Sequence, residues 1–94
     1  MKKVFDEHTD ALFEAILCLK TKEECEMFFQ DICTIKEIQD LSQRYEVARL
    51  LADGCPYQEI ARLTGASTAT ISRVNKAMQY GEGGYQIALG RRER

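Results

Sequence analysis

The residues best suited to chemistry in this sequence are small, hydroxyl and basic side chains between residues 68 and 76. They are Thr68, Ala69, Ser72, Arg73 and Lys76. Short hydroxyl and methyl groups allow a close approach to base edges, and cationic side chains neutralise phosphates. The chemistry that this set can perform is therefore the binding of a nucleic acid.

Two short helices within residues 57–78 would have to present these side chains. Apolar residues fall on one face of each predicted helix: Ile60, Ala61 and Leu63 in the first, and Ile71, Val74 and Met78 in the second. Between the helices, Gly65 can adopt the positive φ of a tight turn, and Ser67 can cap the second helix. This spacing is typical of a helix-turn-helix. An ordinary helical hairpin is the alternative, but it does not require a polar outer face on its second helix.

Charge is unevenly spread along the chain. The formal net charge is −2 over 94 residues. Residues 1–56 hold seven Lys and Arg against twelve Asp and Glu, a balance of −5, whereas residues 57–94 hold six against three, a balance of +3. The basic part coincides with the predicted helix-turn-helix, and this asymmetry favours binding of that part to phosphates.

The first 56 residues are predicted to form three helices, over residues 6–20, 21–33 and 34–53. Thr21 with Glu24, and Thr34 with Glu37, read as capping boxes, and the glycine at position 54 ends the third helix. A chain of this length buries only about 60–65% of its unfolded surface, and the third helix carries a wide apolar arc. We therefore expect a second copy of the chain to pack against it, with a closed monomer as the alternative.

The predicted fold class is all-α, a bundle of about five to six helices that contains a helix-turn-helix. We divide it into a helical dimerisation core (residues 1–56), the helix-turn-helix (57–78) and a glycine-containing C-terminal tail (79–94), all within one structural domain. The glycines that open the tail predict a hinge. Tyr85, Ile87 and Leu89 after it could anchor the tail to the body or to a partner.

Several classes of function are not expected. Cys18, Cys25, Cys33 and Cys55 include no CxxC pair, and His8 is the only imidazole, so no metal site is predicted. Cys18, Cys25 and Cys33 fall among apolar neighbours and are predicted to be buried, reduced thiols, with a redox sensor as the alternative. No catalytic constellation is present, so we expect no enzyme. No apolar run approaches the length of a membrane span, which favours a cytoplasmic protein.

One group of residues carries a resemblance to a known family. Gly54, Gln58-Glu59-Ile60, Gly65-Ala66 and Ala69-Thr70-Ile71-Ser72-Arg73 resemble the tryptophan repressor family, most closely its YerC/YecD-type branch, and the likeness extends back to Thr34. It implies an intertwined all-helical homodimer that binds double-stranded DNA. The glycine-rich segment after residue 80 stands where the family has a final regular helix, so the resemblance does not extend to a role of this tail in the dimer.

The resemblance also implies which residues contact DNA. It places Thr68, Ala69 and Ser72 at base edges in the major groove, and Gln58, Thr70, Ser72 and Lys76 near phosphates. Arg73 would contact a phosphate or a small ligand. Water and DNA shape are then expected to supply part of the specificity, because none of the residues placed at base edges is an arginine that could bind guanine.

A small-molecule corepressor is a further implication. Two arginines flank the ligand in the tryptophan-binding member and match Arg44 and Arg73, while Thr34 matches a threonine at the rim of the pocket. Two guanidinium groups suit a flat ligand with a carboxylate. Val74 and Ala77 stand where that member has a glycine and a serine, so a ligand other than tryptophan is expected. The alternative has no pocket: Arg44 pairs with the acid four positions earlier, and Arg73 contacts phosphate.

The leading hypothesis is a dimeric, sequence-specific DNA-binding regulator of transcription, acting as a repressor. A second class of protein stays open, an adaptor whose helix-turn-helix contacts other proteins, because the first half of the chain is acidic and the net charge is small. An enzyme has the least support from the residues.

Overall fold

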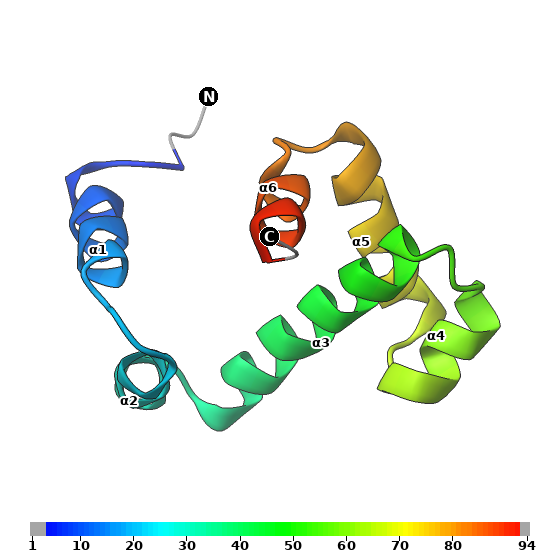
Figure 1. The fold of residues 1–94 in the computed structure, drawn as a ribbon, viewed down its shortest axis with the longest axis horizontal. Helices are drawn as coiled ribbons and strands as arrows, with labels where there is room; N and C mark the ends of the chain where they lie inside the picture. The colour runs from blue at the N-terminus through cyan, green and yellow to red at the C-terminus, as the bar shows by residue number, and fades with distance from the viewer. Residues whose placement is uncertain (1–3, 93–94) are drawn as a thin grey trace. The chain divides into compact units, whose positions relative to one another are not determined.

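A computed structural model of the chain describes residues 4–92 and consists of six α-helices (Figure 1). They are α1 (Glu7–Leu17), α2 (Lys22–Ile32), α3 (Ile35–Ala52), α4 (Tyr57–Thr64), α5 (Thr68–Tyr80) and α6 (Gly84–Arg92). No β-strand occurs in this described part, so the predicted all-α fold is confirmed. The chain divides into two compact units, Met1–Ile38 and Gln39–Arg94, and each is described by itself.

An acidic cap begins α1. The Asp6 carboxylate accepts a hydrogen bond from the N–H of Thr9 at 3.0 Å, and the Thr9 hydroxyl accepts one from the N–H of Asp6 at 2.7 Å. This reciprocal pair satisfies two backbone groups near the helix N-terminus. α1 ends at Leu17, before the predicted end at Lys20, because the next two N–H groups bond to carbonyls three residues earlier and tighten the last turn.

α2 begins at the predicted cap, where the Thr21 hydroxyl accepts a hydrogen bond from the N–H of Glu24 at 3.0 Å. The Glu24 carboxylate accepts from the N–H of Lys20 at 2.8 Å. No residue of α1 or α2 is buried. The exposed large apolar side chains of this unit are Val4, Phe5, Phe13, Leu17, Met27, Ile32 and Ile35. The described residues of the first unit therefore have no hydrophobic core of their own.

The cysteines lie closer to solvent than predicted. Cys18 and Cys25 are exposed, Cys33 and Cys55 are half-buried, and none of the four forms a disulfide. The prediction of buried thiols is therefore wrong for a single chain. The reason for the first two is that α1 and α2 leave their apolar faces uncovered.

Both ends of α3 are fixed by local hydrogen bonds. At the start, the Thr34 hydroxyl accepts from the N–H of Glu37 at 3.1 Å, and the Glu37 carboxylate accepts from the N–H of Thr34 at 2.8 Å, which confirms the predicted capping box. At the end, Gly54 adopts φ of 79°. The N–H groups of Gly54 and Cys55 both bond back to α3 carbonyls at 3.0 Å, as in a Schellman motif.

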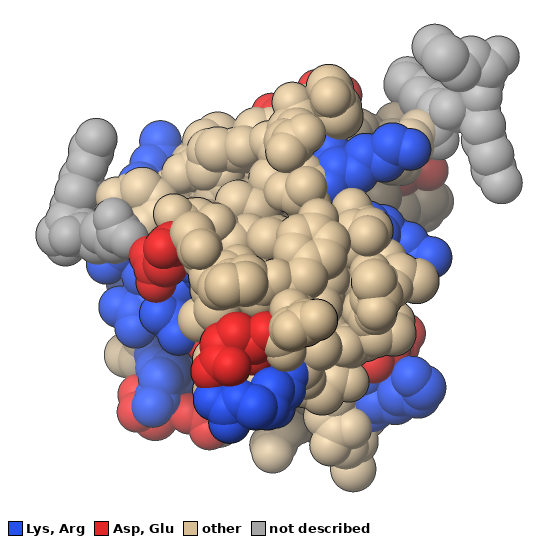
Figure 2. Space-filling model, turned by 90° about the vertical axis from the view of Figure 1, so that its right-hand side faces the viewer, with Lys and Arg blue, Asp and Glu red and all other residues tan. Residues whose placement is uncertain are grey.

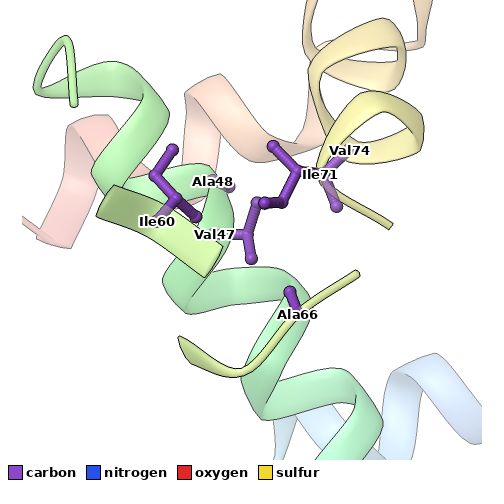
Figure 3. Packing of buried hydrophobic residues seen from close by; sticks show 6 residues of the cluster. All are labelled: Val47, Ala48, Ile60, Ala66, Ile71 and Val74. Carbon is purple, nitrogen blue, oxygen red and sulfur yellow. The ribbon is translucent and has the colours of Figure 1, made fainter. Parts of the chain in front are cut away.

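The second unit holds the core (Figure 3). Its buried residues come from α3, α4, the turn before α5, and α5: Val47, Ala48, Ile60, Ala66, Ile71 and Val74. Half-buried apolar residues surround them, namely Leu50, Leu51, Cys55, Ala61, Met78, Tyr85 and Leu89. The core therefore joins the two helices of the predicted helix-turn-helix to the C-terminal half of α3.

Leu63 does not share the apolar face predicted for it and is 54% exposed. The inner face of α4 carries Ile60, Ala61 and Thr64, which are all buried or half-buried. At about 100° of rotation per residue, Leu63 lies roughly 100° from the middle of that face. Its exposure follows from the helical period.

The sixth helix, α6, lies within the predicted glycine-containing tail and brings the count to the upper value of the predicted five to six. Tyr85 and Leu89, four residues apart, pack α6 against the core, so the predicted anchoring to the body is confirmed for these two. Ile87 is exposed. The side-chain amide of Gln86 donates to the carbonyl of Met78 and ties the new helix to α5. A Cβ at Gly81, between the helices, would collide with the carbonyl oxygen of Ala77.

Within residues 4–92, no helix is both long enough and apolar enough to cross a membrane. No cluster of His, Cys, Asp and Glu in that range could hold a metal ion.

Candidate nucleic-acid interface

The turn between α4 and α5 has the geometry predicted for a helix-turn-helix. Gly65 caps the C-terminus of α4, and its φ of 73° is a left-handed conformation that residues with a side chain rarely adopt. Ala66 follows and is buried in the core. Ser67 then caps α5, since its hydroxyl oxygen accepts a hydrogen bond from the N–H of Thr70 at 3.1 Å. The predicted roles of Gly65 and Ser67 are confirmed.

α5 turns its small and basic residues away from the core. Ile71 and Val74 are buried on its inner side. The exposed residues of the outer side include Thr68, Ala69, Ser72, Arg73, Lys76 and Ala77. Thr70 is half-buried, and its hydroxyl accepts a hydrogen bond from that of Ser67 at 3.1 Å. Gln58 lies exposed in the first turn of α4, so the residues predicted to contact DNA lie at the surface of α4 and α5, with Thr70 the most covered of them.

The charge of α5 is entirely positive. Its sequence contains no Asp or Glu, and Arg73 and Lys76 are its two cations. Neither side chain forms an ion pair with any residue that the structure describes. Both therefore present uncompensated charge to solvent, at positions on the exposed side of the helix.

Two arginines outside α5 are paired with acids instead. Arg62 donates two hydrogen bonds to the Glu59 carboxylate on α4. Arg49 donates two to the Glu46 carboxylate on α3, at 2.6 and 3.1 Å. These bonds lower the pKa of both glutamates below the ordinary value and raise the pKa of both arginines. Because Glu59 offsets the charge of Arg62 on α4, the uncompensated positive charge of the helix-turn-helix lies on α5.

Figure 2 looks at the side of the molecule that lies to the right in Figure 1, where α4 and α5 are. Uncharged side chains fill most of the middle of this face, and Lys and Arg lie mainly toward its margins, some of them beside Asp and Glu. Such a face has a neutral centre, which is able to approach bases closely.

A shallow hollow opens beside the second half of α5. Arg73, Lys76, Ala77, Tyr80 and Gly81 line it, and its volume is about 360 Å³. Tyr80, which is 79% exposed, lines the hollow together with these two cations. The combination suits a small anion, or an aromatic compound that carries a carboxylate.

Arg73 is the predicted ligand residue that lines this hollow. Arg44 is exposed on α3, and its guanidinium forms no hydrogen bond or ion pair within residues 4–92. Thr34 belongs to the first unit, where its hydroxyl caps α3. Within the second unit, Arg73 is thus brought together with Lys76 and Tyr80, and not with Arg44.

Two residues of this region were not singled out from the sequence. Tyr80 follows Arg73 by seven positions and Lys76 by four, so helical spacing alone could have placed it beside them. Gln43 on α3 donates from its side-chain amide to the backbone carbonyl of Thr64 at 3.1 Å. No local pattern marks Gln43, because its partner lies 21 residues later in the chain.

Comparisons with known proteins bear on this region. A sequence model described as Trp repressor protein matches residues 7–93. The uncharacterised protein YerC of Bacillus subtilis (strain 168) is 54% identical over 89 residues, covering 95% of this chain and 86% of YerC. A TrpR-like protein from Eubacterium eligens ATCC 27750 has a similar structure, with a TM-score of 0.89, 51% identity, and coverage of 92% of this chain and 89% of that one. A candidate Trp repressor from Staphylococcus aureus gives a TM-score of 0.92 at 47% identity, covering 96% and 90%.

Proposed function

Because this chain belongs to the Trp repressor family, we propose that it is a sequence-specific DNA-binding regulator of transcription that acts as a cytoplasmic homodimeric repressor. The family is regulatory and not enzymatic, which agrees with the absence of a catalytic constellation from the sequence. The observation that carries the proposal is the outer side of α5, where small side chains and two unpaired cations stand without any acid.

In this proposal α5 lies in the major groove. Thr68, Ala69 and Ser72 approach base edges, and their short side chains leave room for bridging water. Gln58, Thr70, Arg73 and Lys76 bind phosphates on either side of the groove. The positive end of the α5 dipole, at Thr68, adds attraction for a phosphate.

The homodimer is supported by the first unit. Its exposed apolar side chains, including Phe13, Leu17 and Ile32, have no core of their own to enter. A second copy of the chain would cover them and would place two α5 helices on one DNA duplex. Two such helices fit a pseudo-palindromic operator with half-sites about one helical turn apart, roughly 34–36 Å.

A small-molecule corepressor is part of the same proposal. Arg73, Lys76 and Tyr80, which line the hollow, would bind its carboxylate and ring. The resemblance adds Arg44 and Thr34 as further candidate ligand residues. Val74 packs in the core, and Ala77 at the wall of the hollow offers no polar group to an ammonium. We therefore favour an aromatic carboxylate other than tryptophan.

Selection of genomic DNA fragments by the purified protein tests the proposal, with and without a panel of aromatic carboxylates. We expect a palindromic site to be enriched, and its binding to weaken steeply with salt. The double variant Arg73→Ala/Lys76→Ala should lose binding, whereas Lys20→Ala/Lys22→Ala, which removes two cations from the first unit, should keep it. Failure to enrich any site would instead favour the adaptor that contacts only proteins.

A further inference from the structure

A side-chain hydrogen bond links α3 to the turn of the helix-turn-helix. The amide Nε2 of Gln43 donates to the backbone carbonyl of Thr64 at 3.1 Å, in a partly buried position. Thr64 is the last residue of α4, so its carbonyl has no acceptor role inside that helix. Gln43 supplies the donor that this helix end lacks.

Thr64 is held by its hydroxyl as well. Its Oγ1 donates to the carbonyl of Ile60 at 2.7 Å and accepts from the N–H of Ala66 at 3.1 Å. The N–H of Gly65 bonds to the carbonyl of Ala61 at 2.9 Å. Every residue from Thr64 to Ala66 thus has a hydrogen bond that fixes its backbone, and α5 begins two residues later.

Gln43 lies one helical turn before Val47, which with Ala48 is fully buried in the core that α3 shares with α4 and α5. α3 therefore contacts the helix-turn-helix in two chemically different ways. The apolar contact at Val47 tolerates sliding and rotation, because dispersion forces have little directionality. The hydrogen bond from Gln43 is directional and fixes one carbonyl relative to α3.

We propose that Gln43 is a positioning residue that sets the orientation of α5 relative to α3, and through it the discrimination between DNA sequences, without touching DNA. The inference deepens the proposed function and rests on it. Discrimination by short side chains such as those of Ser72 and Ala69 depends on where the helix backbone lies, since these groups cannot reach far. A turn that is free to shift would blur the difference between right and wrong sites more than it would weaken attraction to phosphate.

Two variants and one control test this inference. Gln43→Met keeps the length of the side chain and removes the donor, and Gln43→Glu places a carboxylate oxygen opposite the Thr64 carbonyl. Gln39→Met makes the same chemical change one turn earlier on α3, at an exposed position. The measurements are amide hydrogen exchange in the protein without DNA, and the ratio of affinities for the selected site and for random DNA.

In Gln43→Met we expect exchange at Gly65 and Ala66 to quicken about fivefold, the change that one lost neutral hydrogen bond produces. Exchange at Ile71 and Val74, within α5, should stay as in the wild type. The affinity ratio should fall about three- to tenfold, with unchanged affinity for random DNA. Gln43→Glu should show a larger increase in exchange and a larger fall in the affinity ratio than Gln43→Met. Gln39→Met should match the wild type in both measurements.

A Gln43→Met protein with wild-type exchange at the turn would overturn the inference. So would a variant that melts at a lower temperature while its affinity ratio stays unchanged, because Gln43 would then only stabilise the fold. Failure of the proposed function looks different. The wild type would then select no site, and exchange at Gly65 and Ala66 would still decide whether Gln43 holds the turn.

Discussion

The hydroxyl oxygen of Ser67 accepts a hydrogen bond from the backbone N–H of Thr70 at 3.1 Å. This bond satisfies one of the N–H groups that the first turn of α5 leaves without a partner inside the helix. It also defines the residue at which the proposed recognition helix begins.

Ser67→Ala should therefore lower the free energy of unfolding by about 1 kcal/mol, the usual value of a helix N-cap. Ser67→Asp keeps an acceptor at this position and should remain close to the wild type in stability. Urea unfolding followed by circular dichroism measures both. Equal stability of Ser67→Ala and the wild type would show that the cap contributes nothing.

Gly65→Ala should destabilise the protein by about 1–2 kcal/mol, because a side chain is disfavoured at φ of 73°. The matched control is Gly90→Ala on α6, where an added Cβ meets no atom within 4 Å. That change should be neutral or stabilise by up to about 1 kcal/mol, since alanine favours helix. The melting temperature of Gly65→Ala should thus fall below that of the wild type, and the melting temperature of Gly90→Ala should stay unchanged or rise.

Lys76→Ala should weaken binding to all DNA sequences by a similar factor. It should also reduce the slope of log affinity against log salt by about one, as expected for one lost phosphate contact. Ser72→Ala should instead change the order of preference among sites. Fluorescence anisotropy at several salt concentrations measures both effects. An unchanged salt slope for Lys76→Ala would remove Lys76 from the phosphate contacts.

The ion pair between Glu59 and Arg62 predicts a dependence of stability on pH. The pKa of Glu59 is lowered by its hydrogen bonds with Arg62, so the unfolded chain binds more protons as the pH falls. The pair stabilises the fold above the ordinary pKa of glutamate, and this stabilisation is lost as the pH falls below that value and through the lowered pKa of Glu59.

Both side chains of this pair are largely exposed, at 43% and 67%, so the effect should be small and should shrink further at high salt. As the pH falls through this range, the free energy of unfolding of Glu59→Gln should decrease less than that of the wild type. Melting temperatures at low ionic strength compare them. Parallel pH profiles for the two proteins would contradict a contribution from the pair.

Leu17 is 84% exposed on α1, which makes it a test of the homodimer. If a second chain covers it, Leu17→Glu should raise the dissociation constant of the dimer about 30-fold or more. Glu14→Gln, on the same helix and also exposed, serves as the control. Sedimentation equilibrium measures the association. A wild-type protein that stays monomeric at high concentration would exclude the dimer.

The features that were predictable from the sequence are those set by local spacing. Thr34 and Glu37, which are three residues apart, cap α3. Gly65 forms the turn through its backbone conformation, and Ser67 caps α5 with its side chain. Ile71 and Val74 lie on the inner face of α5 because the helical period places them there.

Features that depend on tertiary contacts were not predictable in this way. Glycines precede and begin α6, yet the helix forms because Tyr85 and Leu89 pack against the core. The bond from Gln43 to Thr64 joins residues far apart in the chain. Exposure of Cys18 reflects the uncovered face of α1, which the apolar pattern alone could not reveal.

The outer side of α5 has one more property, which concerns entropy. Thr68, Ala69 and Ser72 have at most one rotatable bond each between heavy atoms of the side chain, and alanine has none. A surface built from such groups has almost no rotameric freedom to lose when a partner covers it. Complexes formed through this surface should therefore lose little side-chain entropy on binding, which favours their affinity.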